Sequence, residues 1–85
     1  MFWVYIIESE DGSWYIGQTE NLKRRIAEHK GGYGSKTTAK KHQWRCIYCE
    51  GYLHHKDALG RERYLKSGSG RKYITKQLKH FFEES

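Results

Sequence analysis

The stretch that decides the fold is FWVYIIESEDGSWYIG, residues 2–17. Its two halves, residues 2–7 and 13–17, are rich in the β-branched and aromatic side chains that are typical of strands. Between them, residues 10–12 are Glu-Asp-Gly, a sequence that favours a tight turn. The stretch therefore predicts a β-hairpin that carries two tyrosines, Tyr5 and Tyr15.

The length of the turn decides where these two tyrosines point. A three-residue loop with Gly12 in the left-handed conformation pairs Tyr5 with Gly17 and Ile7 with Tyr15, so both phenols share one face. A two-residue loop shifts the register and places the phenols on opposite faces. We expect the three-residue loop.

The rest of the chain alternates helical and extended patterns. Leu22 and Ile26 are four residues apart, as in the buried stripe of a helix. We expect, in chain order, a helix from its cap Thr19 to about Lys30, a strand over residues 44–49, a helix over about 56–66 and a helix from near Arg71. Residues 67–70, Ser-Gly-Ser-Gly, are expected to break the chain between the last two helices.

This order of elements predicts an α+β fold, a small three-stranded antiparallel sheet flanked by about three helices. In the last helix Ile74, Leu78 and Phe81 recur at helical spacing as its buried face. The 85 residues form one small domain, residues 1–85, with a thin core.

The net charge of +6 favours a polyanionic partner, and nucleic acid is the commonest soluble one. The N-terminus lacks the pattern of a signal peptide, and the longest apolar run, residues 2–7, is far too short to span a bilayer. We therefore expect a cytoplasmic protein that engages no membrane and keeps Cys46 and Cys49 as reduced thiols.

Two polar residues border the buried stripe of the first helix. Arg25 and His29 are four residues apart beside Leu22 and Ile26, so both point toward the sheet edge. Helical phase favours Arg25 over Arg24. A guanidinium matches the geometry of a phosphate, and an imidazole can carry a proton or donate to a phosphate. A surface arginine and an interfacial histidine are the ordinary alternatives.

Glu62 is the sharpest clue in the second predicted helix. It lies between Ala58, four residues before, and Leu65, three residues after, so its carboxylate projects from the apolar side. A carboxylate there is costly without a cationic partner or a metal ion. The residues alone favour a salt bridge to Arg25 or a tyrosine hydrogen bond, with a metal ion as the alternative.

The ordered set of these residues resembles the GIY-YIG nuclease domain. The set comprises Tyr5, Tyr15 in Tyr-Ile-Gly, Arg25, His29 and Glu62 in Arg-Glu. The resemblance runs from about residue 2 to residue 78 and is greatest to the small stand-alone members. This chain departs from the family where Trp3 replaces the first glycine. It also has no asparagine after Asn21, whereas some members carry one in the last helical region.

The resemblance implies a metal-dependent endonuclease that hydrolyses phosphodiester bonds in nucleic acid, which we expect to be DNA. Tyr5 and Tyr15 would be its catalytic phenols, and Arg25 would contact the phosphate. His29 matches a histidine often found one turn later, and Glu62 matches the carboxylate that holds a single Mg²⁺ or Mn²⁺ ion. Tyr5 would help to remove a proton from the attacking water, with Tyr15 or His29 orienting it. No base-reading motif is visible, so we expect selection by the shape of the substrate.

Cys46 and Cys49 are separated by two residues, with histidines nearby, a spacing that would suit zinc. However, the two cysteines have opposite parity on a regular strand and should point to opposite faces. We therefore favour two ordinary strand residues over a zinc site.

Several basic side chains are candidates for contacts with a nucleic-acid backbone: Lys36, Lys40, Lys41, Arg45, Arg71 and Lys72. A solvated surface explains them nearly as well. A non-catalytic nucleic-acid-binding module that kept the fold is thus the second hypothesis, and an adaptor acting through protein contacts is a third. The carboxylate of Glu62 favours the enzyme, because a binding module has no need of it.

Overall fold

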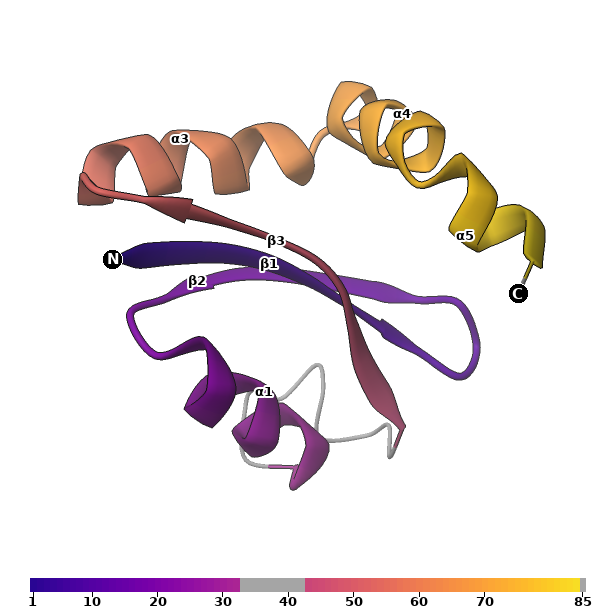
Figure 1. Ribbon diagram of the computed structural model, residues 1–85, viewed down its shortest axis with the longest axis horizontal. Coiled ribbons are helices and arrows are strands. Elements are labelled where there is room, and N and C mark those ends of the chain that lie inside the picture. Colours follow the sequence, from indigo (N-terminus) through magenta and orange to yellow (C-terminus); the bar gives the residue numbers. More distant parts are fainter. Residues whose placement is uncertain (33–42, 85) are drawn as a thin grey trace.

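The computed structural model describes residues 1–32 and 43–84. Strands β1 (Phe2–Ser9), β2 (Trp14–Thr19) and β3 (Trp44–Tyr52) form one antiparallel sheet in the order β2-β1-β3. Helix α1 (Leu22–Lys30) lies on one side of this sheet (Figure 1). On the other side lie helices α3 (His55–Leu65), α4 (Gly68–Gln77) and α5 (Lys79–Glu84). The predicted α+β architecture is confirmed.

The hairpin has the predicted register. Tyr5 pairs with Gly17, and Ile7 pairs with Tyr15. The turn is closed by a hydrogen bond of 2.9 Å from the Ser9 N–H to the Ser13 carbonyl, and Gly12 has a φ of +83°. A glycine adopts this left-handed backbone without strain. Both phenols therefore lie on the same face of the sheet.

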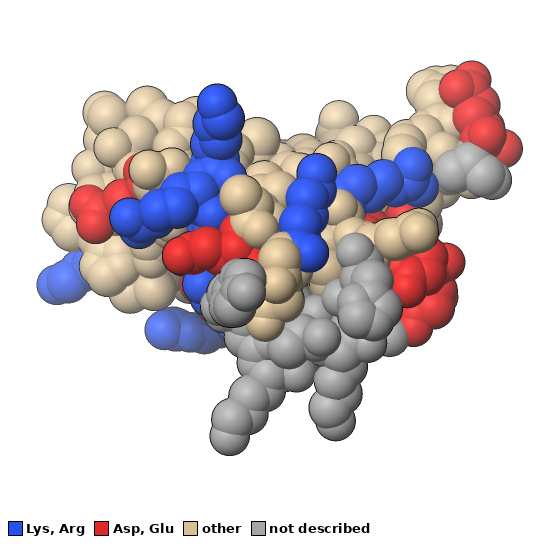
Figure 2. Space-filling model, turned by 90° about the horizontal axis from the view of Figure 1, so that it is seen from below, with Lys and Arg blue, Asp and Glu red and all other residues tan. Residues whose placement is uncertain are grey.

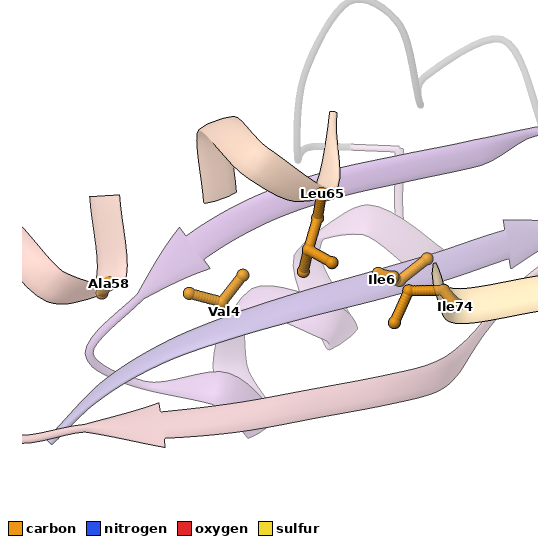
Figure 3. Packing of buried hydrophobic residues seen from close by; sticks show 5 residues of the cluster. All are labelled: Val4, Ile6, Ala58, Leu65 and Ile74. Atoms are coloured by element: carbon orange, nitrogen blue, oxygen red, sulfur yellow. The ribbon is translucent and has the colours of Figure 1, made fainter. Parts of the chain in front are cut away.

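The central strand β1 buries side chains on both faces. Toward α3 and α4, Val4 and Ile6 pack with Ala58, Leu65 and Ile74 (Figure 3). Toward α1, Tyr5, Ile7 and Trp44 pack with Leu22 and Ile26, the predicted stripe of the first helix. Two small cores therefore share one strand, which explains why residues 4–7 are an unbroken buried run.

A bulge in β3 changes where its cysteines point. Tyr5 pairs with Cys49 and Ile7 with Cys46, so two steps along β1 match three along β3, and Ile47 is the extra residue. Such a bulge interrupts the strict alternation of a strand. Because Tyr5 and Ile7 share a face, Cys46 and Cys49 share it too. The expectation that they point to opposite faces is wrong.

Two helices begin at residues other than those predicted. Asn21, not Thr19, caps α1: its side chain accepts a hydrogen bond of 3.0 Å from the Arg24 N–H, and Thr19 instead ends β2. Ser67 caps α4, where its hydroxyl accepts a 3.1 Å bond from the Gly70 N–H. Residues 68–70 thus form the first turn of α4 rather than a break, because a serine cap outweighs the poor helix propensity of glycine.

The C-terminal segment, predicted as one helix, is two. At Leu78 the backbone (φ −102°, ψ 32°) leaves the helical region, which ends α4 and starts the short α5. Ile74 is buried and Leu78 packs beside it, as predicted, whereas Phe81 lies under the guanidinium of Arg45 at 4.8 Å. None of the described helices is long and apolar enough to cross a bilayer.

Gly70 allows α4 to pack closely against the end of α3. A Cβ built on Gly70 would lie 2.2 Å from the Tyr64 carbonyl oxygen and 2.5 Å from the Leu65 Cα. Gly70→Ala should therefore destabilise the protein by about 2 kcal/mol. Gly68→Ala is the matched control in the same turn and should be neutral, because nothing lies within 4 Å of its added Cβ. Urea denaturation measures both, and equal stabilities would contradict this packing.

Candidate active site

Tyr5 lies in the middle of the sheet, and its side chain crosses the neighbouring strand. A Cβ built on Gly17, its partner in β2, would lie only 2.4 Å from the Tyr5 hydroxyl oxygen. Any residue larger than glycine at position 17 would displace the phenol. Tyr5 is 1% exposed. Because β2 is an edge strand, Gly17 lets a buried phenol extend its hydroxyl toward the edge of the sheet.

His29 of α1 contacts this hydroxyl from the α1 side of the sheet. Its Nε2 lies 2.8 Å from the Tyr5 oxygen, and the residue is fully buried. Burial lowers the pKa of His29 from its ordinary 6.5, and the positive charge of Arg25 lowers this pKa further. The imidazole is therefore neutral at pH 7, and with its proton on Nδ1 it accepts the hydrogen bond from the phenol. A buried neutral histidine can take a proton from Tyr5, but it cannot reach a phosphate at the surface.

Arg25 and Tyr15 complete this group. The Arg25 guanidinium is hydrogen-bonded with the Tyr5 hydroxyl and pairs with Glu28 at 3.3 Å. The ring of Tyr15 lies 4.8 Å from the His29 ring and 6.4 Å from the Tyr5 ring, measured between centroids. Burial raises the pKa of Tyr5 to about 12, although the hydrogen bond with Arg25 opposes this shift. Tyr5, Tyr15, Arg25 and His29, here called the phenol cluster, thus come together.

Glu62 approaches the phenol cluster from a helix on the other side of the sheet. Its negative charge is near enough to contribute to the raised pKa of Tyr5. Its side chain is 20% exposed, and Oε2 accepts a hydrogen bond of 2.7 Å from Lys66. The salt bridge expected with Arg25 is instead made with Lys66, because residues four apart on a helix face each other.

A hollow of about 390 Å³ lies between β2 and the junction of α3 with α4. Tyr15 and Lys66, the partner of Glu62, both line it. Arg71 lines it as well, with its guanidinium 4.1 Å from the centre of the Trp14 ring. Two cations beside Tyr15 suit a phosphate-bearing ligand.

The predicted backbone-binding residues have different surroundings. Arg45 pairs with Glu8 at 3.1 Å, Arg71 stacks on Trp14, and Lys72 is exposed. The other three lie outside the described residues: Lys36, Lys40 and Lys41. Figure 2, seen from the α1 side, shows Lys and Arg side chains interspersed with Asp and Glu.

A half-buried ion pair that no sequence motif indicated holds α3 against β3. Arg61 binds Glu50 through two hydrogen bonds, of 2.8 Å from Nε and 3.1 Å from a terminal nitrogen. The hydroxyls of Tyr48 and Tyr52 donate to the same carboxylate at 2.7 and 2.9 Å. Burial alone would raise the pKa of Glu50, but these four hydrogen bonds outweigh it and lower the pKa.

This Glu50–Arg61 pair sets the rotation of α3 about its axis. Arg61 turns toward β3, and the next residue, Glu62, is rotated about 100° from it around the helix. The guanidinium of Arg61 also lies over the rings of Tyr64 and Tyr73, at 5.1 and 4.8 Å from their centroids. The sequence signal was the alternation of Tyr48, Glu50 and Tyr52, which puts a carboxylate between two phenols on one strand face.

Comparisons with known proteins cover most of the chain. The family model described as the GIY-YIG catalytic domain matches residues 1–75. A UPF0213 protein of Streptococcus pneumoniae serotype 4 is 38% identical over 64 residues, 75% of this chain and 65% of that protein. The UPF0213 protein YazA of Bacillus subtilis is 31% identical over 80 residues, 94% of this chain and 75% of that protein. The solution NMR structure of the UPF0213 protein BH0048 from Bacillus halodurans matches with a TM-score of 0.57 and 31% identity. That match covers 91% of this chain and 85% of the other.

The lowered pKa of His29 predicts acid sensitivity of the fold. As pH falls below 6.5, the unfolded state takes up a proton that the buried imidazole still refuses. The free energy of unfolding should therefore fall by about 1.4 kcal/mol per pH unit until the folded-state pKa is reached, and be fully retained above pH 6.5. His29→Gln should flatten this slope, and the exposed control His80→Gln should not. Denaturation at pH 5, 6 and 7.5 measures the slope, and an unchanged slope in His29→Gln would refute the assignment.

The Glu50–Arg61 pair predicts a large loss of stability from a small change. Glu50→Gln preserves the shape of the side chain but leaves the half-buried guanidinium of Arg61 without its anion, which should cost about 2 kcal/mol. Glu83→Gln is the control, because Glu83 and Lys79 form an exposed ion pair with a long N–O distance of 4.0 Å. This substitution should change the free energy of unfolding little. Thermal and urea unfolding compare them, and equal losses would show that the pair does not anchor α3.

Proposed function

Because this chain belongs to the GIY-YIG family, whose members are generally nucleases, we propose that it is a divalent-metal-dependent endonuclease acting on DNA. Its reaction would be hydrolysis of a phosphodiester bond, with selection by the shape of the substrate rather than by base sequence. One observation carries the proposal: a phenol, an imidazole and a guanidinium meet at a single hydroxyl, that of Tyr5, within the influence of the Glu62 carboxylate. A structural core has no need of this combination.

The residues present fit a single divalent ion. The described residues contain no group of three or more His, Cys, Asp or Glu side chains that could enclose a metal. Mg²⁺ keeps several waters and accepts one protein carboxylate, which Glu62 provides at the surface. Bound there, Mg²⁺ or Mn²⁺ would supply positive charge that stabilises the phosphoryl group and the departing oxygen. Lys66 balances the charge of Glu62 in the structure as it stands.

The chain's own side chains would move the proton and hold the phosphate. Arg25, with its side chain 29% exposed, would bind a phosphate oxygen and stabilise the charge that grows on it. A phenol whose pKa is about 12 is a poor base alone. Tyr5 would therefore take a proton from the attacking water while it passes its own to the neutral Nε2 of His29. Tyr15, which is less buried, would orient the water.

A non-catalytic nucleic-acid-binding module is the second candidate. The observations that favour it are the 1% exposure of Tyr5 and the ion pair that already occupies Glu62. In that case Arg25, Arg71 and the other basic side chains would bind the backbone without cleavage, and affinity would fall steeply with salt.

Cleavage of branched, nicked and single-stranded DNA with Mg²⁺ or Mn²⁺ tests the proposal. We expect metal-dependent products, lost at least about 100-fold in Glu62→Ala. Glu83→Ala is the matched control, because Glu83 also faces a lysine four residues away, Lys79, which here precedes the carboxylate. Tyr5→Phe should lose about 100-fold, whereas Tyr64→Phe should retain activity. Salt-dependent binding by all these variants with no cleavage by the wild type would replace the enzyme by the binding module.

A further inference from the structure

The bulge at Ile47 creates a pair of neighbouring thiols that the proposed nuclease does not use. Cys46 and Cys49 are both exposed and lie on the α1 side of β3, opposite Ile7 and Tyr5. Cys49 is near enough to contribute to the raised pKa of Cys46, and the Cys46 thiol donates a hydrogen bond of 3.5 Å to the Tyr48 carbonyl. These are the chain's two cysteines. We call them the dithiol.

The strand geometry does not favour a disulfide between these thiols. Their partners Tyr5 and Ile7 are two residues apart on a strand, which sets the two cysteine Cα atoms about 6.7 Å apart. Disulfides reach such spacings only at their upper limit, and their Cβ atoms must converge. Side chains on one face of a strand run parallel instead. A bridging cation relaxes this demand, because two metal–sulfur bonds of about 2.3 Å each hold the two sulfur atoms on either side of the ion, farther apart than in a covalent S–S bond.

We propose that Cys46 and Cys49 form a binding site for one soft cation held by two thiolates, of which Cu⁺ is the representative. Thiolates select soft cations. A two-thiolate site suits Cu⁺, which accepts linear coordination, better than Zn²⁺, which takes four ligands. Within residues 1–32 and 43–84, no group of three or more His, Cys, Asp or Glu could enclose a metal.

The binding step exchanges protons for the cation without any change of oxidation state. Two S–H bonds break, two sulfur–copper bonds form, and two protons pass to solvent, so the bound unit carries one negative charge. Burial raises the pKa of the Cys46 thiol, so affinity should increase with pH as this thiol is deprotonated. The site lies beside Tyr5 but shares no residue with the phenol cluster or Glu62.

The test is a titration of the reduced protein, residues 1–85, with Cu⁺ under anaerobic conditions, in competition with a coloured Cu⁺ chelator. We expect one ion per monomer, a release of two protons, and at least a 100-fold loss of affinity in both Cys46→Ser and Cys49→Ser. Glu62→Ala keeps both thiols and should bind Cu⁺ like the wild type even if it cleaves nothing. This separates failure of the site from failure of the proposed nuclease.

Several results would overturn the site. One ion per two chains with a dimer in gel filtration would mean that the thiols bridge molecules. Full affinity in either serine variant would mean that one thiol suffices. Binding of Zn²⁺ as tight as that of Cu⁺ would show a larger ligand set. Circular dichroism of the two serine variants, in which exposed thiols are replaced by a smaller side chain of similar shape, verifies that they remain folded.

Discussion

The hydrogen bond between the Tyr5 hydroxyl and His29 Nε2 joins the central strand of the sheet to helix α1. It requires three local conditions at once. The hairpin must have a three-residue loop, position 17 must have no side chain, and α1 must end with His29 turned inward. Each condition is met by a different part of the chain. This one contact therefore forms only if the hairpin, β2 and α1 are all correctly placed.

The two faces of the sheet differ: one forms an apolar core, and the other carries the polar residues of the candidate site. On the side of α3 and α4, β1 contributes the aliphatic side chains Val4 and Ile6, which form an ordinary apolar core. On the α1 side it contributes Tyr5, whose polar end needs partners because its environment excludes water. Such burial is costly for a domain of this size. The neutral imidazole and the guanidinium of Arg25 offset that cost and make the phenol chemically unusual.

The direction in which the Glu62 side chain points depends on contacts made by other residues. A helix of eleven residues with few buried side chains is weakly positioned by packing alone. The Glu50–Arg61 pair and its surrounding tyrosines fix which way α3 faces, and Glu62 follows from the helical period. The polar contacts that orient Glu62 are therefore made by the residue next to it, Arg61.

Local sequence determined the hairpin, the amphipathic stripe of α1 and the helical phase of Arg25, His29 and Glu62, because turn chemistry and periodicity act over a few residues. The start of α1 depended on which of two capping side chains, Thr19 or Asn21, lay outside the sheet. Only the tertiary structure decided that Glu50 binds Arg61 and that a bulge aligns Cys46 with Cys49. Those outcomes depend on how strands and helices from distant parts of the chain pack together, and the spacing of residues along the chain does not determine that packing.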